Sequence, residues 1–174
     1  MRNSRPALMF LLATLVLSSG VSAQKPARTV RPAASRAADP FIGIWKLSAD
    51  KSKYESGGAP RSFTRTYEDR GGGTVFMTTD VTIPQGSARA YLVYRRDGKP
   101  YPEAAVGAES IRMVTVRAVD SRTEDVYFLV DGKAPEKPST ITISADGMTM
   151  TQVVNGTNSK GKPFTNTVVY DKQS

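Results

Sequence analysis

The sequence predicts an all-β protein, and three observations lead to this fold class. From residue 41 onward, apolar and polar side chains alternate with period two, which is the period of a strand buried on one face. Turn residues separate the alternating runs, and they include the Asp-Gly pairs 97–98, 131–132 and 146–147, a favoured hairpin turn because both central positions take positive φ. No stretch combines a helical apolar period with capping residues. We therefore expect an antiparallel up-and-down β-barrel of about 8–9 strands, with a β-sandwich as the alternative.

Runs of alternating residues define the expected strands. They are residues 42–48, 62–69, 74–82, 88–96, 110–119, 123–130, 139–144, 148–154 and 163–171. The best helical candidate is the segment 102–110, PEAAVGAES, which is short and is interrupted by Gly107. A closed barrel is favoured over a sandwich, because closure removes the unpaired edge strands that a sheet without disulfides would otherwise expose.

Residues 1–23 have the pattern of a signal peptide. Arg2 and Arg5 precede an apolar run at residues 7–17, and residues 21–23, Val-Ser-Ala, resemble a cleavage site. The apolar run has 11 residues, whereas a membrane-spanning helix needs about 20. We therefore expect no transmembrane segment and an exported product, cleaved near Ala23 and either periplasmic or secreted.

The segment 24–39, QKPARTVRPAASRAAD, is expected to be a linker before a single domain at residues 40–174, because it is rich in Ala, Pro and Arg and has no apolar period. More than half of the net charge of +8 comes from the first 39 residues. The linker could rest on an anionic membrane or cell-wall polymer, or serve as a solubilising spacer. Within the domain, acidic residues alternate with basic ones, so nucleic-acid binding is not expected. The domain is expected to be monomeric.

The chain contains neither cysteine nor histidine, and this excludes several kinds of site. Disulfides, zinc sites built on thiolate or imidazole, Cys-His nucleophiles and Ser-His-Asp triads are all ruled out. The carboxylate pairs Glu68-Asp69 and Glu124-Asp125 fall at expected strand ends, where solvated carboxylates are ordinary. We therefore expect no catalytic residue, no metal, no cofactor and no enzymatic activity.

The best candidates for ligand binding are Phe63, Arg65 and Tyr67, which share one face of an expected strand. A guanidinium between two aromatic rings suits an anionic or aromatic ligand. The alternative is an outward arginine lying across surface rings. Arg117 is a second candidate for an interior cation, because it shares a face with Ile111, Met113 and Thr115. Its alternative is an arginine at a strand end that reaches water.

Both ends of the domain resemble a known family. The segment 39–47, DPFIGIWKL, resembles the first strand of the lipocalin and fatty-acid-binding (calycin) barrels, and the segment 168–172, VVYDK, resembles the last strand of fatty-acid-binding proteins. The runs 45–47, WKL, and 51–54, KSKY, with the late hairpin at 155–162, are similar to small exported bacterial lipocalin-like domains.

The resemblance implies roles for three residues. Gly43 would permit a sharp entry into the first strand, and Trp45 would close the barrel floor. Tyr170 would either donate its hydroxyl to a ligand or pack on Trp45. The chain departs from the fatty-acid-binding pattern at Val168, where those proteins carry a carboxylate-binding arginine. The segment 48–60 is polar and glycine-rich, so the helical lid of those proteins is not expected either.

The sequence therefore predicts a lipocalin-like barrel that binds a small hydrophobic or amphipathic molecule. Burial in a preformed barrel would provide the affinity, with Arg65, Tyr67 and Tyr170 as polar anchors. The alternative is a ligand-free structural or protein-interaction module of the bacterial envelope. In that case Met77, Met113, Met148, Met150 and the aromatic residues would fill the interior.

Overall fold

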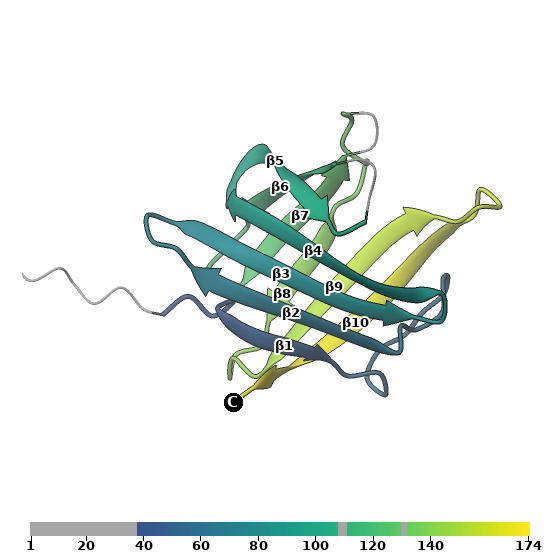
Figure 1. Ribbon diagram of the computed structural model, residues 1–174, viewed down its shortest axis with the longest axis horizontal. Helices are drawn as coiled ribbons and strands as arrows, with labels where there is room; N and C mark the ends of the chain where they lie inside the picture. Colours follow the sequence, from purple (N-terminus) through teal and green to yellow (C-terminus); the bar gives the residue numbers. More distant parts are fainter. Residues whose placement is uncertain (1–37, 108–110, 130–131) are drawn as a thin grey trace, which may run out of the picture. The chain divides into compact units, whose positions relative to one another are not determined.

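The computed structural model describes residues 38–107, 111–129 and 132–174 (Figure 1). The expected signal peptide, most of the expected linker and the Asp131 position of one expected turn lie outside these residues. Within the described ranges, no helix is long and apolar enough to cross a membrane.

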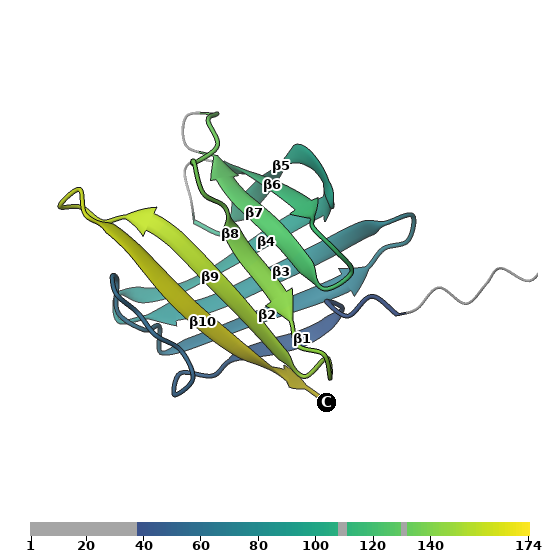
Figure 2. The same cartoon turned by 180° about the vertical axis from the view of Figure 1, so that it is seen from behind.

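Ten strands close into one antiparallel barrel (Figures 1 and 2). They are β1 (Gly43–Leu47), β2 (Ser62–Asp69), β3 (Thr74–Ile83), β4 (Gly86–Arg95), β5 (Asp97–Ala105), β6 (Arg112–Ala118), β7 (Thr123–Leu129), β8 (Ser139–Ile143), β9 (Thr149–Thr157) and β10 (Pro163–Gln173). Each strand pairs with its neighbours along the chain, and β1 pairs with β10 to complete the ring. The predicted all-β, up-and-down barrel is confirmed, with one or two strands more than expected.

The additional strand is β5, and it corrects the sequence analysis. Residues 102–105, part of the segment named above as the best helical candidate, continue β5 instead, while residues 108–110 of that segment are not described. Two prolines, Pro100 and Pro102, obscured the strand, because proline lacks the N–H that a sheet ladder uses. The barrel tolerates them by a register shift between Asp97 and Pro100 on the β6 side, and by pairing β4 with β5 only from Ala90 to Leu92.

The up-and-down topology gives the barrel two distinct ends. The open end carries the β1–β2, β3–β4, β5–β6, β7–β8 and β9–β10 connections, and the closed end carries residues 38–42 and the other four turns. In Figure 1 the β3–β4 and β9–β10 turns lie on one side and the β2–β3 turn lies on the other. Large buried side chains, including Phe41, Trp45, Tyr94 and Met150, form a core toward the closed end.

Trp45 lies in the middle of this core and is 0% exposed. Its Nε1 donates a 2.8 Å hydrogen bond to the carbonyl oxygen of Phe41, and the Lys172 Nζ lies 5.0 Å from its ring centroid.

Gly43, two residues earlier, has a φ of 134°, and a Cβ there would lie 2.8 Å from Lys172 Cε. The entry to β1 therefore favours glycine, because residues with a Cβ rarely adopt this φ, whereas the flexible end of Lys172 could move aside.

We predict that Trp45→Ala lowers the free energy of unfolding by about 3–5 kcal/mol, because it removes a fully buried aromatic side chain. Urea denaturation followed by circular dichroism measures this loss. Ile44→Ala is the matched control, since its side chain is 46% exposed and the change should cost less than about 1 kcal/mol. Similar losses in the two variants would mean that Trp45 does not organise the core.

Candidate functional site

The interior of the barrel contains a cavity of about 430 Å³. Such a volume lies within the range of small-molecule sites, about 300–1,000 Å³. The cavity runs from Phe63, Val81 and Ala88 near the open end to Tyr67 and Glu124 toward the closed end. Ala88 lines the cavity and is nevertheless exposed, which shows that the cavity opens to solvent beside β4.

The cavity exists because one wall of the barrel carries small side chains. In the sheet register, Arg65 of β2 pairs with Thr79 of β3, Thr79 pairs with Ala90 of β4, and Ala90 pairs with Ala105 of β5. These side chains all point inward and line the cavity. The opposite wall is apolar and larger, with Val114, Val126, Phe128 and Ile141. The space between the walls is therefore mostly apolar with a few polar groups.

Arg65 is the most unusual group in the cavity wall. Its side chain is buried, its Cζ lies 5.1 Å from the Phe63 ring centroid and 5.5 Å from the Tyr170 ring centroid, and its Nε has no hydrogen-bond partner. It forms no ion pair with any carboxylate of the described residues. Burial lowers the pKa of Arg65, but its interactions with Tyr170, Tyr67 and Glu103 together outweigh this effect, so the pKa is raised. The cavity therefore contains a buried cation without an anionic partner.

The expected anchors Tyr67 and Tyr170 both lie beside Arg65 but differ in position. Tyr67 lines the cavity, whereas Tyr170 does not and packs edge-on against Phe63, with ring centroids 5.5 Å apart. Both hydroxyls are buried without a hydrogen-bond partner. Burial raises the pKa of Tyr170 to about 12, although Arg65 opposes this shift, and it also raises that of Tyr67. Both phenols are therefore protonated at neutral pH and available as hydrogen-bond donors.

The predicted interior orientation of Arg117 is wrong. Its side chain is 60% exposed, and its guanidinium pairs with Asp125 Oδ2 at 3.0 Å on the outer face. The inward residues of β6 are Arg112, Val114 and Val116 instead. The apolar residues Ile111 and Met113 favoured an inward orientation for the face of β6 that carries Arg117. That face points outward instead, and Ile111 is 64% exposed.

Glu103 and Arg112 are cavity residues that the sequence analysis missed. Glu103 on β5 is 6% exposed, and its Oε2 accepts a 2.7 Å hydrogen bond from Arg112 Nε on β6. The Arg112 guanidinium lies 4.4 Å from the ring centroid of Phe128. The prolines beside Glu103 concealed its strand, and no other signal in the sequence indicated that its side chain faces inward.

The expectation that the carboxylate of Glu124 is solvated at a strand end is wrong, because this side chain is buried. Its side chain is 1% exposed, and its Oε2 lies 2.6 Å from Arg96 Nε. Arg96 also bonds Asp39 Oδ2 at 2.6 Å and lies 4.6 Å from the Phe41 ring centroid. Burial raises the pKa of Glu124, while Arg96 opposes the shift. This cluster seals the closed end, and the inward side chains Val126 and Phe128 at alternate positions could have revealed its orientation.

We predict that Arg96→Met lowers the free energy of unfolding by about 3–5 kcal/mol at neutral pH, because it leaves the buried Glu124 carboxylate without its partner. The folded-state pKa of Glu124 lies above its usual value of 4.5. The folded state therefore binds more protons than the unfolded state above that pH, so stability falls as the pH rises. The loss should shrink as the pH falls toward 4.5, and urea denaturation across this range measures it.

Two further variants control this experiment. Arg96→Met combined with Glu124→Gln should recover part of the stability, because no unpaired charge remains. Arg117→Met removes an exposed arginine and should cost less than about 1 kcal/mol. A loss in Arg96→Met that is independent of pH would contradict the role assigned to Glu124.

Two other observations complete the site. Gln152 on β9 is 3% exposed and lines the cavity, so its amide is a further polar group in the wall. In the part of the chain that the structure describes, no group of three or more Asp or Glu side chains is arranged to hold a metal ion.

The chain matches no known family and no curated protein. Among solved structures, it is similar to a redesigned β-barrel, with 16% sequence identity, a TM-score of 0.44, and coverage of 80% of this chain and 96% of that one.

Proposed function

We propose that this protein is a non-enzymatic carrier that binds one small amphipathic molecule, with the apolar part in the cavity and an anionic group on Arg65. The observation that carries this proposal is the buried guanidinium of Arg65, which faces the cavity without a carboxylate partner. A buried charge left unpaired is costly. An anionic ligand group would supply the missing partner.

The electrostatics of Arg65 favour an anion over a neutral polar group. A hydrogen bond to a charged group contributes about 1.5–3 kcal/mol, roughly twice the contribution of a neutral one. The tyrosine hydroxyl of Tyr67 stands beside the guanidinium as a second donor. A carboxylate or similar group would thus meet two donors at this point of the wall.

The apolar wall supports the second half of the proposal. Val114, Val126, Phe128 and Ile141 offer an apolar surface to a hydrocarbon chain or ring. Burial of each methylene group contributes about 0.8 kcal/mol. Contact between a short hydrocarbon chain and this apolar wall therefore contributes to the binding affinity, while Arg65 sets the orientation of the ligand.

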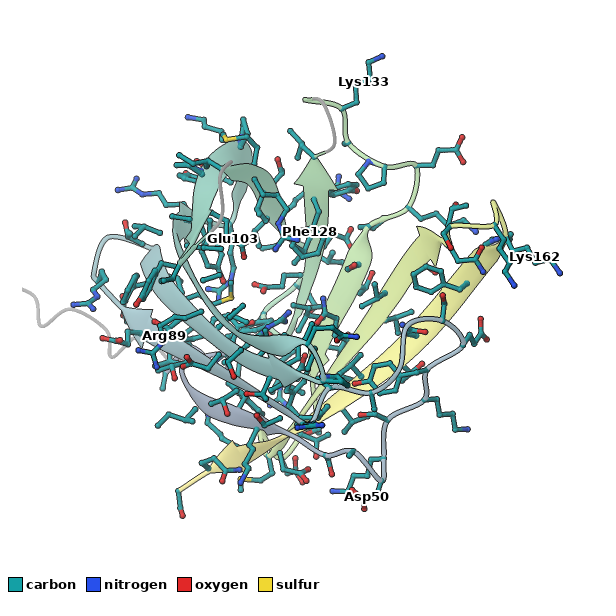
Figure 3. All side chains as sticks on the ribbon, turned by 45° about the vertical axis from the view of Figure 1, so that its right-hand side comes forward. Asp50, Arg89, Glu103, Phe128, Lys133 and Lys162 are labelled. Carbon is teal, nitrogen blue, oxygen red and sulfur yellow. The ribbon has the colours of Figure 1, made fainter. Side chains whose placement is uncertain are left out.

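Charges around the open end also favour an anionic ligand. In the open-end loops, Lys51 pairs with Asp171, whereas the other exposed basic side chains form no ion pair with the described residues. They are Lys53, Arg61, Lys133, Lys137, Lys160 and Lys162. Figure 3 shows Lys133 and Lys162 projecting from two of these loops. Such a positive rim raises the local concentration of anions and speeds their entry.

The sequence resemblance supports placing this carrier among the exported lipocalin-like proteins. The match at both ends of the barrel and the signal-peptide pattern of residues 1–23 support binding outside the cytoplasm, in the periplasm or after secretion. The ligand-free alternative receives less support, because Met148 is 52% exposed and Met113 is only half-buried, so these side chains do not fill the interior.

We predict that the protein binds decanoate about ten- to a hundredfold more tightly than decan-1-ol, and that Arg65→Met removes this preference. The expected ratio follows from the loss of a charge-assisted hydrogen bond. Isothermal titration calorimetry measures both affinities. Arg117→Met is the matched control, because it removes an exposed arginine from the outer face and should leave the preference intact. Tight binding of decanoate by Arg65→Met would overturn the proposed anchor.

We predict that Ala90→Phe weakens binding of decanoate and decan-1-ol by similar factors of at least about tenfold, because the ring occupies the space that the apolar chain needs. Ala104→Phe is the matched control, since Ala104 is adjacent to Ala105 in β5 and is exposed on the outer face. Unchanged binding in Ala90→Phe would place the ligand outside the barrel interior.

A further inference from the structure

The cavity wall holds a carboxylate as well as a cation. Glu103 belongs to an inward row in which Tyr67 pairs with Met77, Met77 with Leu92, and Leu92 with Glu103. Both hydrogen bonds from Arg112 end on the same oxygen, Glu103 Oε2. Among the described residues, the other oxygen, Oε1, accepts no hydrogen bond from a side chain. Glu103 therefore keeps an acceptor free at the wall of the cavity.

Arg65 and Glu103 face the same space without contacting each other. They form no ion pair, yet Glu103 is near enough to contribute to the electrostatics of Arg65. In the register, Arg65 shares its row with Thr79 and Ala90, and Glu103 ends the next row toward the closed end, after Met77 and Leu92. A ligand lying on this wall meets a positive group on one side and a negative group on the other.

A purely structural ion pair does not account for the position of Glu103. The Arg89–Asp80 pair between β4 and β3 lies on the outer face, with side chains 54% and 42% exposed. In the Arg112–Glu103 pair, the arginine is 52% exposed but the glutamate is only 6% exposed. Desolvating a carboxylate is unfavourable, and the partner of Glu103 is 52% exposed, whereas Arg96, the partner of the buried Glu124, is 18% exposed.

We propose that Glu103 is a second ligand-binding residue and that the ligand is bifunctional, with an anionic group bound by Arg65 and a hydrogen-bond donor, hydroxyl or ammonium, bound by Glu103. This inference rests on the proposed function and specifies its ligand class. It predicts an amino or hydroxy acid with an apolar tail rather than a simple fatty acid. Gln152, which lines the cavity from β9 beside Ile141, provides an additional hydrogen-bonding group.

The test compares decanoate, 3-hydroxydecanoate and 3-aminodecanoate by isothermal titration calorimetry on the purified protein. We expect 3-aminodecanoate to bind at least about tenfold more tightly than decanoate, and 3-hydroxydecanoate to lie between them, because a donor to a carboxylate forms a charge-assisted hydrogen bond. In Glu103→Gln the advantage of 3-aminodecanoate should disappear, while decanoate binds as well as before or better.

Two further variants separate ligand binding from a structural role. Glu136→Gln removes an exposed carboxylate from the β7–β8 loop and should leave the ratio between the probes unchanged. Arg112→Gln removes the partner of Glu103 but keeps its carboxylate, so the preference for 3-aminodecanoate should persist or increase. If Arg112→Gln lost the preference as Glu103→Gln does, Glu103 would act only through its ion pair and the proposal would be wrong.

The outcomes also distinguish this inference from the proposed function. Equal affinities for decanoate and 3-aminodecanoate in the wild type, with Arg65→Met still weakening both, would reject the role of Glu103 and retain the carrier. Failure of all three probes to bind the wild type would reject both. Thermal unfolding of each variant verifies that a loss of binding does not arise from a loss of fold.

Discussion

Closure of the sheet between β1 and β10 is the constraint on which the interior depends. Because side chains alternate along every strand, a closed ring assigns each strand residue to either the interior or the outer face. The small residues Thr79, Ala90 and Ala105 then lie side by side on one inner wall, and the cavity forms above them. In an open sheet, the same residues would be a flat solvated surface without a binding volume.

The two buried arginines, Arg96 and Arg65, differ in how their charges are compensated. Arg96 is held between Asp39 and Glu124, so its charge is compensated and the cluster seals the closed end. Arg65 has aromatic neighbours but no carboxylate, and it borders empty space rather than packed side chains. The first arrangement stabilises the barrel by itself. The second is electrostatically incomplete, which is why the proposed ligand is anionic.

Residues that share a strand face can be predicted from the sequence when the strand itself shows a clear alternation of side chains. Phe63, Arg65 and Tyr67 alternate in a clear strand, and all three line the cavity. Strand positions and inward faces cannot be predicted in this way where the local alternation is weak or points to the wrong face. Prolines hid β5 and therefore Glu103, and the apolar residues beside Arg117 indicated the wrong face of β6.

Strand periodicity and hairpin turns are local properties of the chain, so the amino-acid sequence predicts the all-β class, the positions of most strands and the shared face of Phe63, Arg65 and Tyr67. The strand number, the inward direction of that face, the inward face of β6 and the burial of Glu124 follow from the folded barrel. Ring closure brings strands that are distant in sequence around one volume. The separation of Arg65 from the carboxylates of the described residues, and its position in the same cavity as Glu103, therefore arise from pairing between strands, which no single segment encodes.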